Sequence, residues 1–197
     1  MTVVDTDRIA MADSSGPDLD LDTMFELLER MPTPEGYKTE IVEGVIHMSP
    51  QRDVHWQIIR RIVRALEDAF GMDAIVLSDV RIDFPGHLNG FAPDVAKIRE
   101  GAVRSDAGWR YQDVEFVAEV ISRGTAANDY GQKKTAYAWA EVPVLLIADP
   151  YQRRCHVFSE PKGGVYAAET SLAFGLGVDL GSTPLGLTID TGAFPVD

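Results

Sequence analysis

The chain has 197 residues, of which 45% are hydrophobic, and its formal net charge is −13. This length favours one domain with a substantial core, and the acidic balance argues against a protein that coats nucleic acid through bulk charge. A single cysteine, Cys155, excludes an internal disulfide, and its strand-like surroundings predict a small core residue.

Residues 1–20 are polar and acidic, and we predict that they form a disordered tail ahead of a single domain, residues 21–197. Residues 1–30 carry eight acids and two arginines, so nearly half of the net charge lies in the tail and the first helix. The start of the chain lacks the pattern of a secretory leader, and no apolar run approaches the ~18 residues that span a bilayer. We therefore expect a cytoplasmic protein without a membrane segment.

Helix and strand patterns alternate in the first part of the domain. Apolar residues at helical spacing predict a helix over residues 21–31 with Asp22 as its N-cap, and residues 37–49 read as two short strands that turn near Glu43 and Gly44. Residues 51–70 show the clearest helical pattern. The apolar face of that helix consists of Ile58, Ile59, Ile62, Val63, Leu66 and Phe70. The opposite face carries Arg60, Arg61 and Arg64, which either form a solvated surface or contact the phosphates of a nucleic acid.

The residue patterns in the second part of the domain predict a β-α-β crossover and a hairpin. Residues 114–122 read as a buried strand, 128–142 as a helix and 142–149 as an almost wholly apolar strand, an order that favours a parallel strand pair. The other predicted elements are strands over 73–84 and 91–98, a connector over 101–113, a hairpin around 161–164 and a short strand over 185–190. The whole predicts an α/β fold with a mixed sheet flanked by helices.

Two acids interrupt strands that are otherwise apolar. Asp94 opens the run Val95–Ile98, and Glu119 lies inside "EFVAEVIS". Because an unpaired buried carboxylate is costly, either the strand ends near solvent or a cation compensates the acid. Two strand carboxylates that converge at a sheet edge form a site for Mg²⁺ or Mn²⁺, and Lys133 or Lys134 on the next helix supplies a nearby ammonium group.

The order and spacing of six segments resemble the Uma branch of the PD-(D/E)XK nuclease superfamily. The segments are "YKTEIVEGVIHMSP", His55, "APDVAKI", "EFVAEVIS", "NDYGQKKTAY" and "VPVLLIADP". The resemblance covers the chain from about Leu21 onward. It implies a restriction-endonuclease-like core and Mg²⁺- or Mn²⁺-dependent hydrolysis of phosphodiester bonds in DNA.

The resemblance also implies roles for particular residues. Glu40 is the N-terminal acid of the catalytic site, Asp94 and Glu119 are the metal ligands, and Lys133 is the catalytic lysine, moved onto the helix. The chain departs from the superfamily pattern at Ile121, where a lysine is expected. It also departs from the branch at Arg123, usually proline, and at Glu141, usually glycine.

Several alternatives remain open from the sequence. Glu43 competes with Glu40, and Lys134 with Lys133. His55 either touches a substrate phosphate or faces solvent, and Ser122 either acts in the site or only ends its strand.

Two whole-protein hypotheses also stand. The chain is either an active endonuclease or a catalytically inactive nuclease-like scaffold that binds a protein or nucleic acid. Cutting both DNA strands favours a homodimer, and the apolar "SLAFGLGVDLG" segment either covers a partner or packs within the chain.

Overall fold

The computed structural model describes residues 20–32, 36–50 and 52–196. The predicted disordered tail therefore lies outside the described residues, apart from Asp20. Asp20 is the N-cap of α1 (Leu21–Arg30), because its carboxylate accepts a hydrogen bond from the Thr23 amide at 2.8 Å. The predicted cap, Asp22, instead lies in the first turn of that helix, so that assignment was wrong by two residues.

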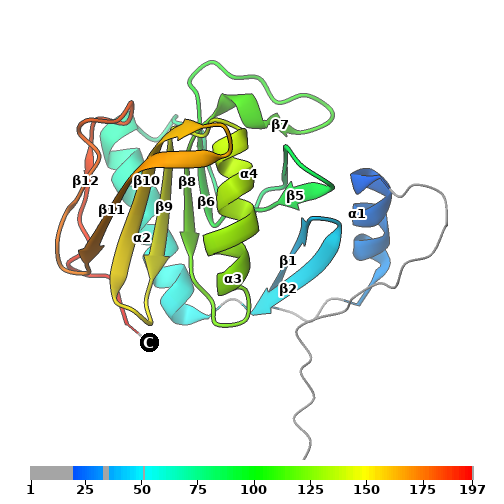
Figure 1. Cartoon of the computed structure of the whole chain (residues 1–197), viewed down its shortest axis with the longest axis horizontal. Helices are drawn as coiled ribbons and strands as arrows, with labels where there is room; N and C mark the ends of the chain where they lie inside the picture. Colours follow the sequence, from blue (N-terminus) through cyan, green and yellow to red (C-terminus); the bar gives the residue numbers. More distant parts are fainter. Residues whose placement is uncertain (1–19, 33–35, 51, 197) are drawn as a thin grey trace, which may run out of the picture.

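The order of elements follows the predicted alternation (Figure 1). After α1, the helical segments are α2 (Asp53–Phe70), a 3-10 turn η1 (Tyr111–Asp113), α3 (Ala126–Asn128), a π turn η2 (Asp129–Lys133) and α4 (Lys134–Trp139). The strands are β1 (Tyr37–Val42), β2 (Val45–Pro50), β3 (Val76–Leu77), β4 (Ile82–Phe84), β5 (Asn89–Phe91), β6 (Val95–Ile98), β7 (Trp109–Arg110), β8 (Val114–Val120), β9 (Val144–Asp149), β10 (Arg154–Lys162), β11 (Val165–Ala173), β12 (Val178–Asp179) and β13 (Thr188–Ile189). Within this described part of the chain, no helix is long and apolar enough to cross a membrane.

A six-stranded mixed sheet, in the order β11-β10-β9-β8-β6-β3, forms the centre of the molecule. Its neighbours β8 and β9 are parallel and pair in register from Phe116 with Val144 to Val120 with Ala148. The segment α3–η2–α4 connects them, which confirms the predicted crossover.

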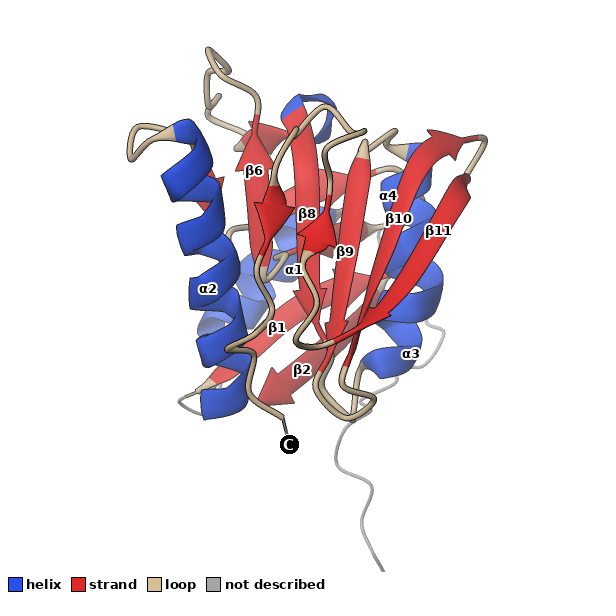
Figure 2. Ribbon diagram, turned by 90° about the vertical axis from the view of Figure 1, so that its left-hand side faces the viewer, coloured by secondary structure: helices blue, strands red, loops and turns tan. Residues whose placement is uncertain are grey.

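The two faces of this sheet bury two different sets of side chains, because successive strand residues point to opposite faces. On one face, Phe116 and Ala118 pack with Ile58 and Ile62 of α2, and Cys155 lies in this cluster, fully buried. On the other face, Val117 packs with Tyr137 of α4 and with β4 and β5. Figure 2 shows α2 and α4 on opposite sides of the sheet.

A second, five-stranded sheet, in the order β2-β1-β5-β4-β7, packs beside the first on the α4 side. The sequence predicts one mixed sheet and does not separate this layer. The connector over residues 101–113 contributes β7 to it, and Met24 and Leu28 of α1 pack on it against Ile41 of β1. Side chains of β1 lie beside the start of β6 and the end of β8.

Candidate active site

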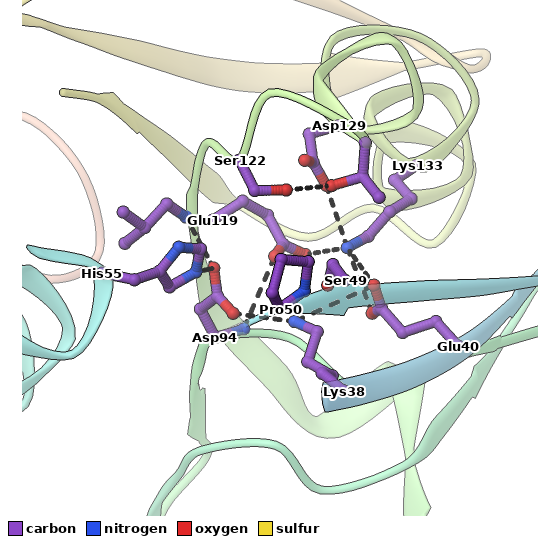
Figure 3. A pocket seen from close by; sticks show the side chains of 12 residues that line it. Lys38, Glu40, Ser49, Pro50, His55, Asp94, Glu119, Ser122, Asp129 and Lys133 are labelled. Carbon is purple, nitrogen blue, oxygen red and sulfur yellow. Dashed lines mark hydrogen bonds and ion pairs between the residues drawn. The ribbon is translucent and has the colours of Figure 1, made fainter. Parts of the chain in front are cut away.

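One pocket gathers nearly all of the acids and lysines that the sequence analysis singles out (Figure 3). It forms where β1, the start of β6, the end of β8, the first turn of α2 and the π turn η2 converge. Its lining residues are Lys38, Glu40, Ser49, Pro50, His55, Asp94, Glu119, Val120, Ser122, Thr125, Asp129 and Lys133.

Asp94 is fixed in the pocket by hydrogen bonds to both carboxylate oxygens. Lys38 Nζ donates to Oδ1 at 2.7 Å, and the Val120 amide donates to Oδ2 at 2.7 Å. His55 Nε2 lies 2.9 Å from the same Oδ2. Burial raises the pKa of Asp94, but Lys38 and His55 outweigh it, and the pKa lies well below its usual range. Asp94 is therefore an ionised, oriented carboxylate.

Glu119 occupies the middle of the pocket floor, although it sits in a strand with apolar neighbours. Its side chain points to the same face of β8 as Ile121, toward α4. Lys133 Nζ lies 2.8 Å from Oε1, and the Tyr137 hydroxyl donates a short hydrogen bond to the same oxygen. The Asp94 amide makes a long contact of 3.5 Å with Oε2, so this second oxygen is the less occupied one.

The pKa of Glu119 is raised to about 8. Burial is the largest cause; Lys133 and Lys38 oppose it, while Asp94 and Asp129 add to it. The two lysines thus do not fully compensate the negative charge around Glu119.

Lys133 links three acids from three parts of the chain. Besides Glu119, its Nζ lies 3.0 Å from Asp129 Oδ1 and 3.1 Å from both oxygens of Glu40. An ammonium group has three N–H donors, so these carboxylates occupy all of them. Burial disfavours the charge on Lys133, but the acids more than offset it, and the pKa lies well above its usual range.

The π turn explains how Lys133 reaches this position. Its wider i→i+5 turn interrupts the helix at residues 129–133 and directs Asp129 and Lys133 into the pocket together. Such turns occur mostly as single turns inside α-helices, often at functional sites. The next residue, Lys134, instead places its Nζ 4.6 Å above the ring of Phe158.

Lys38 and Glu40 project from the same face of β1, because they are two residues apart in a strand. Glu40 accepts a hydrogen bond from the Ala92 amide at 2.8 Å, and Lys38 Nζ lies 3.8 Å from its other oxygen. Burial disfavours the charge on Lys38, but Asp94 and Glu40 outweigh it and raise its pKa. β1 thus supplies one acid and one ammonium group to the pocket.

The donor set fits a divalent cation in charge and chemistry. Glu40, Asp94, Glu119 and Asp129 face two lysines, so the buried cluster carries a formal charge of −2 when His55 is neutral. Mg²⁺ and Mn²⁺ prefer such carboxylate oxygens, and Mg²⁺ is usually bound through one or two of them together with water. Within residues 20–32, 36–50 and 52–196, no group of three or more His, Cys, Asp or Glu side chains is arranged so that it could hold a metal ion.

The structure brings together most of the residues singled out in the sequence. Glu40, Asp94, Glu119 and Lys133 meet in the pocket, with His55 and Ser122 on its wall. The Ser122 hydroxyl is hydrogen-bonded to that of Thr125 at 2.7 Å.

Other candidates lie outside the pocket. Glu43 lies in the β1–β2 turn, where its backbone amide and carboxylate bond to Asn89. The arginines Arg60, Arg61 and Arg64 lie on α2 beyond the pocket, and Arg61 donates to Gln57 of its own helix.

Sequence reasoning missed three members of this site. Lys38 is the first of them, although it lies two residues from Glu40 on a predicted strand, a spacing that places both side chains on the same face. The spacing of four between Asp129 and Lys133 suggests an exposed pair, but Asp129 is only 5% exposed and faces the pocket. Tyr137 is a fully buried core residue, and its hydroxyl also donates a hydrogen bond to Glu119.

A mixed sheet flanked by helices, with acids and a lysine gathered at strand ends, defines a restriction-endonuclease-like, nuclease-type fold. The comparisons with known proteins agree: a family model described as "Putative restriction endonuclease" matches residues 25–192. The chain belongs to this family, Uma2.

One solved structure shares the fold over nearly its whole length. It is described as "a putative nuclease belonging to DUF820" from Anabaena variabilis ATCC 29413. The TM-score is 0.67 at 16% sequence identity, and the match covers 89% of this chain and 97% of that one. No curated protein matches the chain in sequence.

Proposed function

We propose that this protein is a metal-dependent endonuclease that hydrolyses phosphodiester bonds in DNA. One observation carries the proposal: four segments that are far apart in the sequence, namely β1, the start of β6, β8 and η2, place acids and buried ammonium groups in a single pocket. A fold needs no such cluster for stability, because burying charges costs more than burying apolar groups of the same size. Membership of the Uma2 family gives the pocket its chemical context.

Asp94 and Glu119 are the proposed metal ligands. Asp94 is held ionised, and Oε2 of Glu119 has only its long contact with the Asp94 amide. A bound Mg²⁺ or Mn²⁺ would activate a water molecule and polarise the scissile phosphate. Glu40, held by Lys133 and the Ala92 amide, lies beside them and completes the shell directly or through water.

Lys133 takes the place of the lysine that the superfamily carries two residues after the second acid. Ile121 occupies that position and is buried in the core cluster on the α4 side of the sheet. The ammonium group of Lys133 still lies 2.8 Å from Glu119. In our proposal Lys133 orients Glu119 and Glu40 and steadies the negative charge that develops at the phosphate.

The test is cleavage of supercoiled plasmid DNA in Mg²⁺ or Mn²⁺ by the wild type and two lysine variants. Lys133→Met should lower the cleavage rate about 100- to 1,000-fold, the usual loss when one stabilising donor is removed. Lys134→Met is the matched control and should cleave as the wild type does, because Lys134 stacks on Phe158 outside the pocket. Circular dichroism confirms that both variants fold.

Metal binding is measured separately as a Mn²⁺-dependent thermal shift. Lys133→Met should keep the shift, because it removes a cation and no ligand. Equal cleavage by Lys133→Met and the wild type would refute the role of Lys133. DNA binding without cleavage in any divalent metal would favour the inactive scaffold.

A further inference from the structure

A row of exposed side chains on α2 begins beside the catalytic pocket. His55, in the first turn, reaches Asp94 at 2.9 Å (Figure 3). Trp56 is the next residue of the helix. Consecutive Cα atoms are about 3.8 Å apart, so the backbone of Trp56 lies at the pocket wall. Arg60 and Arg64 follow at spacings of four, which places them in line on the same helix face. We call Trp56, Arg60 and Arg64 the α2 stripe.

The α2 stripe is not needed to hold the helix in place. The other face of α2 packs on the sheet through Ile58, Ile62 and Leu66, all fully buried. Trp56 is 54% exposed. A single exposed apolar residue is ordinary, but Trp56 directly follows the pocket residue His55 in the chain, and two exposed arginines continue its helix face.

The charge of this region is opposite to that of the whole chain. Residues 52–64 hold four arginines and one acid, in a chain with a net charge of −13. Arg64 is held only by an exposed pair with Asp68 at 3.7 Å, which competes weakly with a phosphate. Arg60 makes no ion pair with any residue that the structure describes. The stripe is about 12 Å long at 1.5 Å per helical residue.

We infer that the α2 stripe binds a single strand of nucleic acid next to the scissile bond. Trp56 stacks on an unpaired base, and Arg60 and Arg64 contact the phosphates that follow. An indole offers a flat face to any base, whereas a base inside a duplex is already stacked on both sides, so the arrangement favours a single strand. This inference rests on the proposed nuclease function, because that function is what places the scissile bond of the strand in the pocket.

The experiment measures binding of a fluorescently labelled oligothymidylate in EDTA, where no cleavage occurs. Trp56→Ala should bind about 5- to 150-fold more weakly, the usual range for losing one stacked base. Trp139→Ala is the matched control: Trp139 is 60% exposed but lies on α4 against the β10–β11 turn, so its loss should leave binding unchanged. Trp56→Phe should restore most of the affinity, whereas Trp56→Leu should not, because leucine has no π face.

The salt dependence tests the arginines. Replacing Arg60 or Arg64 with alanine should reduce the slope of log affinity against log salt by about 0.7 for each lost phosphate contact to a single strand. An oligouridylate in the same assay shows whether the strand is DNA or RNA, and dependence on Trp56 with either polymer supports the inference.

Two results would overturn it. The first is equal strand binding by the wild type and Trp56→Ala. The second is a wild-type mass of twice 21.6 kDa that Trp56→Ala returns to 21.6 kDa, which would assign the stripe to a second copy of the chain. The strand-binding assay contains no metal and does not depend on cleavage. A failure to cleave plasmid DNA would therefore refute the proposed nuclease function without changing how the binding result is interpreted.

Discussion

Glu119 and Asp94 are both buried acids, yet their surroundings differ. Asp94 has a lysine, an imidazole and a backbone amide around it, whereas Glu119 shares one lysine with two other acids. Burial is the largest cause on each: it raises the pKa of Glu119 to about 8 against the opposing effect of Lys133 and Lys38, whereas Lys38 and His55 outweigh it at Asp94, whose pKa is lowered. Loss of the two carboxylates should therefore affect stability in opposite directions.

We predict that Asp94→Asn destabilises the metal-free protein by about 3–5 kcal/mol, because it leaves Lys38 buried without its closest partner. Glu119→Gln should leave stability unchanged or raise it, because it removes one of several crowded negative charges. Urea denaturation in EDTA measures both. Equal decreases in the free energy of unfolding of the two variants would show that the lysines compensate both acids to the same extent.

The same two variants test the metal site. In the wild type, Mn²⁺ at 100 times its dissociation constant should add about 2.7 kcal/mol of stability, because the ion binds only the native state. Both variants should lose that gain. A full Mn²⁺ shift in either one would remove that residue from the ligand set.

At the scale of elements, the site depends on one irregular turn and one regular hairpin. The π turn η2 directs Asp129 and Lys133 inward, and the β1–β2 hairpin of the second sheet brings Lys38 and Glu40 to the start of β6 and the end of β8. Each turns polar side chains toward a place where strands end.

The β10–β11 hairpin offers a test of turn packing away from the site. Its two-residue loop, Gly163-Gly164, has φ of 58° and 80°, as a type I′ turn requires. A Cβ at Gly163 would meet nothing within 4 Å, whereas a Cβ at Gly164 would overlap the indole of Trp139. We predict that Gly163→Asn is neutral, because asparagine tolerates positive φ, and that Gly164→Asn costs at least about 1 kcal/mol through overpacking. The midpoint of urea unfolding measures both, and equal midpoints would contradict this account of the turn.

At the scale of the whole molecule, the open question is assembly. The segment 171–181, which by sequence either covers a partner or packs internally, is divided between the core and the surface. Val178 and Leu180 are fully buried and Phe174 lies against the same core, whereas Leu176 is 57% exposed. An exposed strand remains at the edge of the six-stranded sheet, because β11 pairs only with β10 there and Val165 is 64% exposed.

We predict a homodimer, since each domain has one candidate pocket to cut one strand and twofold pairing is the commonest closed symmetry. Light scattering at micromolar concentration should give twice 21.6 kDa. A mass of 21.6 kDa would remove the dimer and favour cleavage of one strand at a time, without affecting the pocket.

The sequence by itself determined the elements whose patterns are long and regular. The helix of residues 53–70, the parallel pair β8 and β9 and the helical crossover between them follow from periodicity, because one buried face imposes one repeat. Asp94 and Glu119 stood out for the same reason, as acids in apolar strands. The second sheet did not stand out, because β4 and β5 have three residues each and β7 has two, which is too short to show a repeat.

Only the tertiary structure decided how the buried charges are compensated. Lys38 and Asp94 are 56 residues apart, and Lys133 and Glu40 are 93 apart, so no local pattern pairs them. Lys133 rather than Lys134 points into the pocket because of the geometry of the π turn. Asp129 is buried because Lys133, its partner, also binds Glu40 of β1. Compensation between charges depends on distances in space, and those distances are set by how the sheets and helices pack.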